Sequence, residues 1–221
     1  MHYTIIIPIH NEEKSIPNLL SELKAYSKEN QILIINDGSD DSSKKILNNC
    51  DFISLINMKK NYGKGYCIRR GIENAKSKKI IIFDGDLELE TRDLSKLMIL
   101  DKSNNINFVI GSRFINQDFL CSIWDFGNLI FKIIFNIIYK SSIDDVLCCA
   151  KAFYKNDLEK SDIKSVGFDI DIEILTILIQ IYRSPKIVPL NYKRRNYKEG
   201  KKITFIDSAR IFYRMIIKKF K

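Results

Sequence analysis

One pair of carboxylates in the sequence has a spacing that suggests chemistry. Asp84 and Asp86 flank a single glycine, directly after the apolar run Ile80–Phe83. Two carboxylates held this close repel each other unless a cation lies between them. Oxygen ligands with few protein donors suit Mg²⁺ or Mn²⁺, which keep coordination positions open for substrate phosphates. The pair therefore predicts a divalent-cation site; the alternative is a polar turn with two solvated aspartates.

Three further polar segments follow apolar, β-branched runs that predict strands. They are His10–Glu12, Asp37–Asp41 and Asn61–Gly65. Ligands in open α/β sheets bind beyond the carboxyl ends of the strands, so four such segments on one rim predict a single binding site. No P-loop and no G-x-G-x-x-G pattern is present, which disfavours the common nucleotide-binding loops.

Individual residues of these segments suggest contacts with a nucleotide. The turn around Gly63 and Lys64 offers backbone N–H groups and an ammonium to a phosphate. Asp37 could accept hydrogen bonds from a base or ribose, and its alternative role is that of a turn residue. His10 suits a stacking position beside a nucleotide better than a hydrolytic role, because no Ser/His/Asp or Cys/His set accompanies it.

These segments are positioned by an alternation of strands and helices in the first half of the chain. This alternation predicts a parallel, doubly wound sheet, with strands at Tyr3–Pro8, Gln31–Asn36, Phe52–Ile56, Lys79–Asp84 and Phe108–Gly111. The second half predicts helices at Ile123–Tyr139, Ile170–Tyr182 and Ile206–Phe220 and a short strand at Ile187–Leu190. The first of these helices is unusually apolar. Core packing is its default explanation, and contact with lipid is the alternative.

Length and composition restrict the kinds of protein that this chain can be. The 221 residues suffice for one sizeable core, and the net charge of +9 indicates an anionic partner. A nucleic-acid partner is supported by the net charge alone. We therefore expect the anionic partner to be a phosphorylated substrate or an anionic membrane face instead. Five cysteines without a C-x-x-C indicate neither a disulfide framework nor a zinc site. We expect no signal peptide and no membrane-crossing helix, since Leu129–Tyr139 would span only ~16 Å.

Jointly, the motifs resemble those of inverting glycosyltransferases of family 2, which have the GT-A fold. The resemblance rests on Ile5–Glu13, Asn36–Ser42, Asn61–Ile72, Asp84–Glu88 and Gly111–Phe114. Two departures stand out, because His10 replaces the family's usual tyrosine and Asn36 its first aspartate.

The second half is similar to the dolichyl-phosphate mannose synthase and polyprenyl-phosphate glycosyltransferase branch. The similarity rests on Gly127-Asn128, Asp145–Lys151, Gly167–Glu173 and Tyr192–Ile203. The arginine usual before Gly127-Asn128 is missing, and Ala150 replaces an aromatic residue.

The resemblance implies a single GT-A domain over residues 1–221. Its doubly wound, mainly parallel sheet would carry a C-terminal acceptor-side subregion of helices and short strands. Residues 1–115 would bind the nucleotide sugar and residues 116–221 would form the acceptor side. The implied reaction moves a sugar, with inversion, from a uridine or guanosine diphosphate donor to a polyprenyl phosphate. The enzyme would be peripheral, at the anionic inner face of the cytoplasmic membrane.

The resemblance also assigns roles to residues. The metal would be Mg²⁺ or Mn²⁺ on Asp84 and Asp86. The nucleotide sugar would contact Pro8, His10, Asn11, Glu12, Asp37, Gly63, Lys64 and Asp84. The catalytic set would be Asp86, Arg113, Lys151, Glu173 and Arg195. The acceptor phosphate would be held by Arg113, Arg195, Lys201 and Lys202.

Other functions remain open at this point. A glycosyltransferase acting on a hydroxyl would need a general base, for which Asp145 and Glu173 are candidates. A catalytically silent nucleotide-sugar-binding module is a second alternative, and the intact Asp84/Asp86 pair argues against it. A nucleotidyltransferase shares the sheet and the carboxylates, but it gives no reason for the Tyr192–Ile203 segment.

Overall fold

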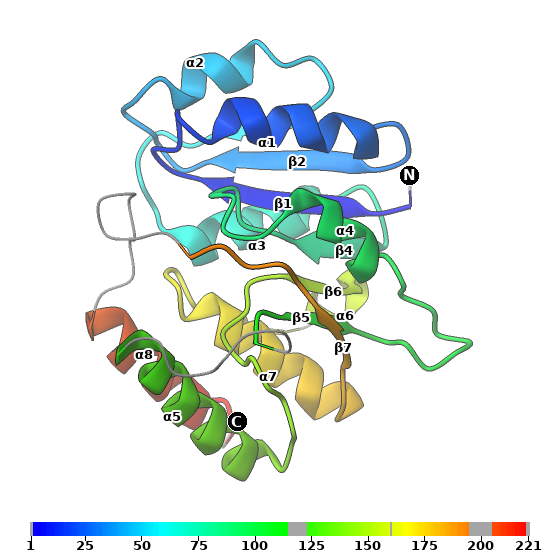
Figure 1. Cartoon of the computed structure of the whole chain (residues 1–221), viewed down its shortest axis with the longest axis vertical. Helices are drawn as coiled ribbons and strands as arrows, with labels where there is room; N and C mark the ends of the chain where they lie inside the picture. The colour runs from blue at the N-terminus through cyan, green and yellow to red at the C-terminus, as the bar shows by residue number, and fades with distance from the viewer. Residues whose placement is uncertain (1, 115–122, 160, 195–204, 220–221) are drawn as a thin grey trace.

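The computed structural model describes residues 2–114, 123–159, 161–194 and 205–219 (Figure 1). Within these ranges seven strands form one sheet, in the order β3-β2-β1-β4-β6-β5-β7. Their bounds are Thr4–Ile9 (β1), Gln31–Asn36 (β2), Ser54–Asn57 (β3), Lys79–Ile82 (β4), Val109–Ser112 (β5), Lys151–Tyr154 (β6) and Lys186–Pro189 (β7).

The sheet is mainly parallel, as predicted, with one exception. Strand β6 pairs antiparallel with both β4 and β5, whereas the β1–β2, β1–β4, β2–β3 and β5–β7 pairs are parallel. The sequence analysis did not predict β6. It is only four residues long, and a lysine occupies its first position. The arrangement is the expected α/β architecture, with β6 inserted between two strands that run in the opposite direction.

Helices cover both faces of the sheet, which explains why its central strands are apolar throughout. Buried side chains on one face pack against α1 (Ile16–Leu23), α2 (Ser43–Asn48) and α4 (Leu94–Leu97). Those on the other face pack against α3 (Lys64–Asn74), α5 (Ile123–Tyr139), α7 (Ile170–Tyr182) and α8 (Phe205–Ile217). The remaining short helices are η1 (Lys24–Tyr26), η2 (Thr91–Asp93) and α6 (Lys155–Glu159).

Helices α5 and α8 lie side by side at one end of the molecule, at the lower left of Figure 1. They are joined where the Tyr139 hydroxyl donates to the carbonyl of Met215 at 2.7 Å. Phe135 and Tyr139 of α5 are buried, but Ile133 and Ile137 of the same helix are exposed. The apolar surface predicted for this helix is thus divided between the core and the exterior. No helix among the described residues is both long and apolar enough to cross a bilayer.

The start of α3 packs closely against the segment that precedes α7. The Gly65 amide donates to the carbonyl of Val166 at 2.8 Å. A Cβ on Gly65 would lie 2.5 Å from the carbonyl oxygen of Ser165, closer than side-chain atoms approach in real structures. Gly65 therefore permits a backbone contact between the two halves of the chain.

We expect Gly65→Ala to lower the free energy of unfolding by about 1–3 kcal/mol, because the 165–166 backbone must move away. Gly127→Ala in α5 is the matched control, since a Cβ there meets no atom within 4 Å. Inside a helix, alanine is more favourable than glycine by about 1 kcal/mol, so the control should be neutral or stabilising. Urea denaturation of the two variants checks this. Equal stability of both variants would show that the 165–166 backbone can move away from the new Cβ at no energetic cost.

Candidate active site

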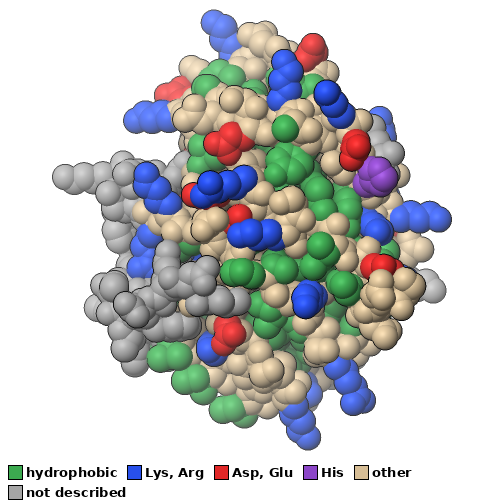
Figure 2. Space-filling view, turned by 45° about the vertical axis from the view of Figure 1, so that its right-hand side comes forward, with side chains coloured by type: hydrophobic (Ala, Val, Ile, Leu, Met, Phe, Trp, Pro, Cys, Tyr) green, Lys and Arg blue, Asp and Glu red, His purple; other side chains and the backbone are tan. Residues whose placement is uncertain are grey.

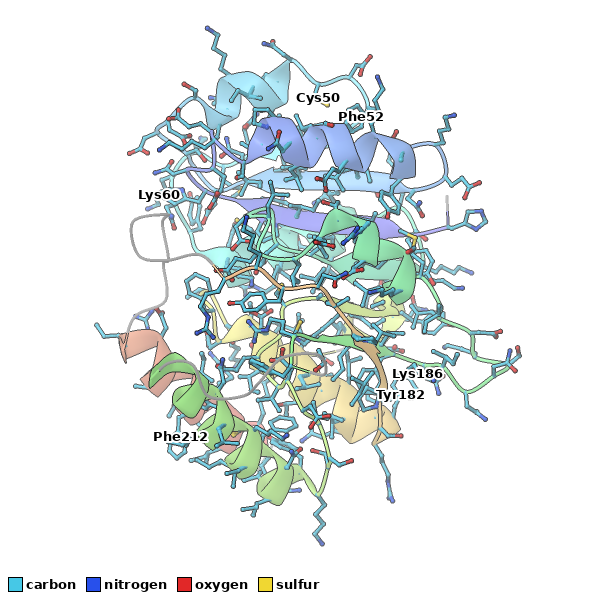
Figure 3. All side chains as sticks on the ribbon, viewed as in Figure 1. Cys50, Phe52, Lys60, Tyr182, Lys186 and Phe212 are labelled. Atoms are coloured by element: carbon cyan, nitrogen blue, oxygen red, sulfur yellow. The ribbon has the colours of Figure 1, made fainter. Side chains whose placement is uncertain are left out.

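A cavity of about 520 Å³ lies beyond the carboxyl ends of the parallel strands. These ends point to the left in Figure 1, and Lys60, which follows β3, is labelled on that side in Figure 3. Of the residues predicted to bind the nucleotide sugar, all but Asn11 line the cavity: Pro8, His10, Glu12, Asp37, Gly63, Lys64 and Asp84. Asp86 and Arg113 line it as well. The structure therefore brings the four polar segments together at one site.

The loops after β1 and β2 are joined by side chain to backbone hydrogen bonds. The side-chain Oδ1 of Asn11 accepts from the Asp40 backbone amide at 3.0 Å, and the Asn11 backbone amide donates to the Ser39 hydroxyl at 3.0 Å. The Glu12 amide donates to the Ser43 hydroxyl at 2.9 Å. Asn11 thus shapes the rim, and the structure does not place it among the cavity-lining residues.

Asp37 holds the loop that leads into α3. Its carboxylate oxygens accept from the amides of Tyr62 and Gly63 at 2.7 and 2.9 Å, and the side chain is buried. The His10 ring donates from Nδ1 to the Asp37 carbonyl at 2.9 Å, because a carbonyl can only accept. The Glu12 carboxylate accepts from the Ser15 hydroxyl at 2.8 Å. These side chains fix the two loops, and each retains atoms that line the cavity.

Lys64 lies between two carboxylates from distant parts of the chain. Its ammonium nitrogen is 2.9 Å from both oxygens of Asp84 and 2.9 Å from Oδ2 of Asp171. Burial alone would lower the pKa of Lys64, but the Asp171 and Asp84 carboxylates together raise it well above its usual range. Burial conversely would raise the pKa of Asp84, and the Lys64 ammonium lowers it below its usual range. Both groups are charged at neutral pH.

The residues at the end of β4 fit a divalent cation. Asp84 already accommodates a cationic nitrogen against both of its oxygens. Asp86 lines the same cavity, with Oδ1 accepting from the Glu88 amide at 3.0 Å. Over the described ranges, no three His, Cys, Asp or Glu side chains are grouped as a metal site. A cation here would therefore depend on the two aspartates and on substrate oxygens, which suits Mg²⁺ or Mn²⁺.

Arg113 is fixed in the cavity wall by Asp145. Its Nε and one terminal nitrogen donate to the two carboxylate oxygens at 2.7 and 2.8 Å, and its backbone amide donates to the same carboxylate at 3.1 Å. The guanidinium also lies over the ring of Tyr192, 5.3 Å from its centre. Burial opposes the charge, but Asp145 raises the pKa of Arg113 well above its usual range. The result is a permanent, rigidly oriented cation.

Two predicted catalytic residues lie outside the cavity wall. Lys151 is buried in β6, where it pairs with Ile82, and its ammonium lies 3.9 Å from Asp171. Glu173 is buried against α8, with the Lys218 ammonium at 2.8 Å. Burial would raise the pKa of Glu173, but Lys218 and the Ser165 amide lower it below its usual value of 4.5. Glu173 therefore pairs with Lys218 and does not line the cavity, so its predicted catalytic role stays a prediction.

Three predicted residues, Arg195, Lys201 and Lys202, lie outside the described residues, so their assignments stay predictions. The cavity also contains residues that the sequence analysis did not single out. They include Phe168, Asp171, Tyr192, Arg194 and Asp207. Asp171 could have been found, because it lies inside the Gly167–Glu173 motif, two positions before a glutamate that was assigned a role.

The Arg113–Asp145 pair predicts a large stability difference between adjacent aspartates. Asp145→Asn would leave a largely buried guanidinium without its counter-charge, which typically costs about 3–5 kcal/mol. Asp144 has a 48% exposed carboxylate that pairs with Lys132, so we expect Asp144→Asn to cost less than about 1 kcal/mol. Chemical denaturation of both variants measures the difference. A similar small effect at both positions would mean that water replaces Asp145 readily.

Two curated relatives are named for sugar transfer involving polyprenyl phosphates. A dolichyl-phosphate beta-glucosyltransferase of Dictyostelium discoideum is 27% identical over 211 residues, covering 82% of this chain and 64% of the relative. An undecaprenyl-phosphate 4-deoxy-4-formamido-L-arabinose transferase of Pseudomonas fluorescens is 31% identical over 105 residues, covering 43% of this chain and 31% of the relative. The chain thus spans less than two thirds of the length of these curated relatives.

Solved structures show the fold. Glucosyl-3-phosphoglycerate synthase from Mycobacterium tuberculosis, in complex with UDP, aligns with a TM-score of 0.77 at 12% identity, over 99% of this chain and 80% of that one. Its complex with Mn²⁺, UDP and glucosyl-3-phosphoglycerate aligns with a TM-score of 0.73. The fold is therefore GT-A, as predicted. The family model described as glycosyl transferase family 2 matches residues 4–161, well over half of the sequence, and the chain belongs to that family.

Proposed function

We propose that this chain transfers a sugar, with inversion, from a nucleoside diphosphate donor to a polyprenyl phosphate, with Mg²⁺ or Mn²⁺ bound at Asp84 and Asp86. The observation that carries the proposal is the charge arrangement of the cavity. Carboxylates for a cation lie just after β4, and an arginine fixed by an ion pair lines the same cavity. Residues 1–115 supply the donor side, and residues 116–221 supply most of the acceptor side.

The donor half of the proposal rests on Asp37, Lys64 and the two aspartates after β4. Each of them lines the cavity, and the start of α3 presents Lys64 at the first turn of a helix. Positive charge at this place favours a diphosphate. When bound, the divalent cation would act as a Lewis acid that stabilises the leaving diphosphate. UDP is the donor nucleotide of choice for a first test, because it is bound in a solved structure of the same fold.

The acceptor half of the proposal rests on whether the candidate general bases are paired with cations. A hydroxyl acceptor needs a general base, whereas a phosphate is already ionised at neutral pH. Asp145 accepts two hydrogen bonds from Arg113, and Glu173 accepts one from Lys218 outside the cavity. Asp171, a further carboxylate of the wall, is paired with Lys64. Carboxylates neutralised by cations are poor bases, so Asp145, Glu173 and Asp171 do not support a hydroxyl acceptor.

The attack then requires charge neutralisation more than proton transfer. An oxygen of the acceptor phosphate forms the new bond to the anomeric carbon, on the face opposite the bond to the diphosphate, which breaks. Two anions must approach each other before this step, and Arg113 is oriented to bind one of them. Arg194 lines the same cavity. The curated relatives are named for transfer to dolichyl or undecaprenyl phosphate, which supports a lipid phosphate as acceptor.

A membrane-facing surface follows from the exterior of α5 and α8. We define the α5–α8 surface by its exposed apolar residues, which are Ile130, Ile133, Ile137, Ile206, Phe212 and Tyr213. Ile137 is 73% exposed and Ile206 is 66% exposed. Figure 2 shows hydrophobic side chains projecting at the lower left, the end at which α5 lies in Figure 1, and Figure 3 labels Phe212 there. Exposed isoleucines spaced three and four apart on a helix suit insertion among lipids.

The same two helices line the cavity with their amino-terminal turns. Gly127, Asn128 and Phe131 of α5 and Asp207, Ser208 and Ile211 of α8 contribute to the wall. Exposed Arg210 of α8 and the net charge of +9 suit an anionic membrane, which we place at the cytoplasmic face. A lipid phosphate could then reach the cavity while its hydrocarbon chain stays in the bilayer.

Vesicle co-sedimentation tests the membrane surface. We expect the double variant Ile133→Ser/Ile137→Ser to bind phosphatidylglycerol vesicles roughly tenfold more weakly than the wild type, because exposed apolar area no longer enters lipid. Its melting temperature should be nearly unchanged, since both side chains are exposed. Ile181→Ser, at a 47% exposed isoleucine of α7, is the matched control and should bind normally. Equal binding by all three proteins would remove the α5–α8 surface from the proposal.

A transfer assay tests the activity itself. Wild-type protein with Mn²⁺, labelled UDP- and GDP-sugars and a short-chain polyprenyl phosphate should move label into the organic phase. Asp84→Asn and Asp86→Asn should each reduce transfer by about 10²-fold or more, because a charge that stabilises the leaving group is lost. Asp101→Asn, in an exposed loop, is the control and should retain full activity. Label in a water-soluble saccharide would instead identify a hydroxyl acceptor, and nucleotide binding without any transfer would indicate a binding module.

A further inference from the structure

Asp171 connects two buried lysines that come from different parts of the fold. Its Oδ2 is 2.9 Å from the Lys64 ammonium, and its Oδ1 is 3.9 Å from the Lys151 ammonium. The three side chains are at most 10% exposed. A buried charge is tolerated only where an opposite charge and hydrogen bonds compensate for lost water. Asp171 therefore supplies part of the charge compensation for both lysines.

Lys64 has a second partner, which is the carboxylate of the proposed metal site. Asp84 contacts the same ammonium at 2.9 Å, so Lys64 is shared between Asp84 and Asp171. A divalent cation on Asp84 would compete with this ammonium for the same oxygens. The Lys64 ammonium can separate from Asp84 only if another anion still balances its charge. Asp171 is already in contact with this ammonium and can do so.

The backbone keeps Lys64 close to Asp171 whatever Asp84 binds. The Gly63 amide on one side of Lys64 donates to Asp37, and the Gly65 amide on the other donates to the carbonyl of Val166. Val166 lies just before α7, the helix that carries Asp171. The ring of Phe168 adds a further contact, 5.7 Å from the Lys64 ammonium. These contacts hold Lys64 beside Asp171, and Asp84 contacts the same ammonium from the segment after β4.

We propose that Asp171 is a positioning residue for donor binding: it holds Lys64 so that Asp84 can exchange the ammonium for a divalent cation carried with the diphosphate. This inference rests on the proposed function and adds a residue to it. It also assigns Asp171 a role other than that of a general base. Both of its oxygens face ammonium groups, which leaves its charge engaged with Lys64 and Lys151.

A double-mutant cycle with Mn²⁺ binding as the readout tests the inference. Free Mn²⁺ is followed by electron paramagnetic resonance at saturating UDP, for the wild type, Asp171→Asn, Lys64→Gln and the double variant. In the wild-type background, Asp171→Asn should raise the apparent Kd for Mn²⁺ about tenfold, because Lys64 then binds Asp84 alone. In the Lys64→Gln background the same substitution should change the Kd by less than about twofold. Asp171→Glu should restore much of the affinity.

Asp169→Asn is the matched control. It removes a buried carboxylate two positions away that pairs with Arg214 rather than with a lysine of the cavity. It should lower the melting temperature without changing Mn²⁺ affinity, which separates positioning from general stability.

The possible failures are distinguishable. If Asp171→Asn weakens Mn²⁺ binding equally in both backgrounds, the Asp171 charge attracts the metal ion directly and does not act through Lys64. The inference is then wrong. If Asp171→Asn leaves Mn²⁺ binding unchanged but abolishes transfer, the residue acts on the acceptor and the inference is equally wrong. If the wild-type protein binds no Mn²⁺ with UDP, the proposed function fails first.

Discussion

The site depends on the ion pairs that one lysine ammonium makes with two carboxylates. Lys64 is only 10% exposed, and its charge is balanced by Asp84 after β4 and by Asp171 in α7. These two carboxylates come from opposite halves of the chain, so the ion pairs also join the halves. A neutral residue at position 64 would leave two carboxylates facing each other, and a neutral residue at 171 would leave Lys64 dependent on Asp84. Charged groups from both halves of the chain are thus paired at the cavity.

Strand ends and periodic helices were predictable because their signals are local. The bounds of β2, α5 and α7 are those expected from the sequence. The polar segments after the parallel strands do meet at one rim, since parallel strands end on the same side of a sheet. Strand β6 was not predicted, because a run of four residues that begins with a lysine carries no clear period of two. Its lysine is tolerated by a carboxylate from another element, and no local pattern contains that information.

The partners of charged residues were the least predictable part of the site. Asp145 could have been a base, and only the structure shows Arg113 bound to both of its oxygens. Glu173 lies in a motif beside Asp171, yet the two point to different surroundings, α8 for one and the cavity for the other. Residue type and spacing identified the candidates. Which carboxylate neutralises which cation depends on contacts between residues as many as 107 positions apart.

The place of β6 in the sheet has a consequence for how the chain assembles. Strands β1 to β4 and the loop around Asp37 are complete by residue 82, and their contacts are comparatively local. Strand β5 cannot join them directly, because β6 must first enter between β4 and β5, and β7 then adds on the far side of β5. During synthesis, β4 therefore has an unpaired edge until residues 151–154 leave the ribosome, and such edges invite association between chains. The first four strands can pair early, whereas completion of the sheet waits for long-range pairings that are intrinsically slow.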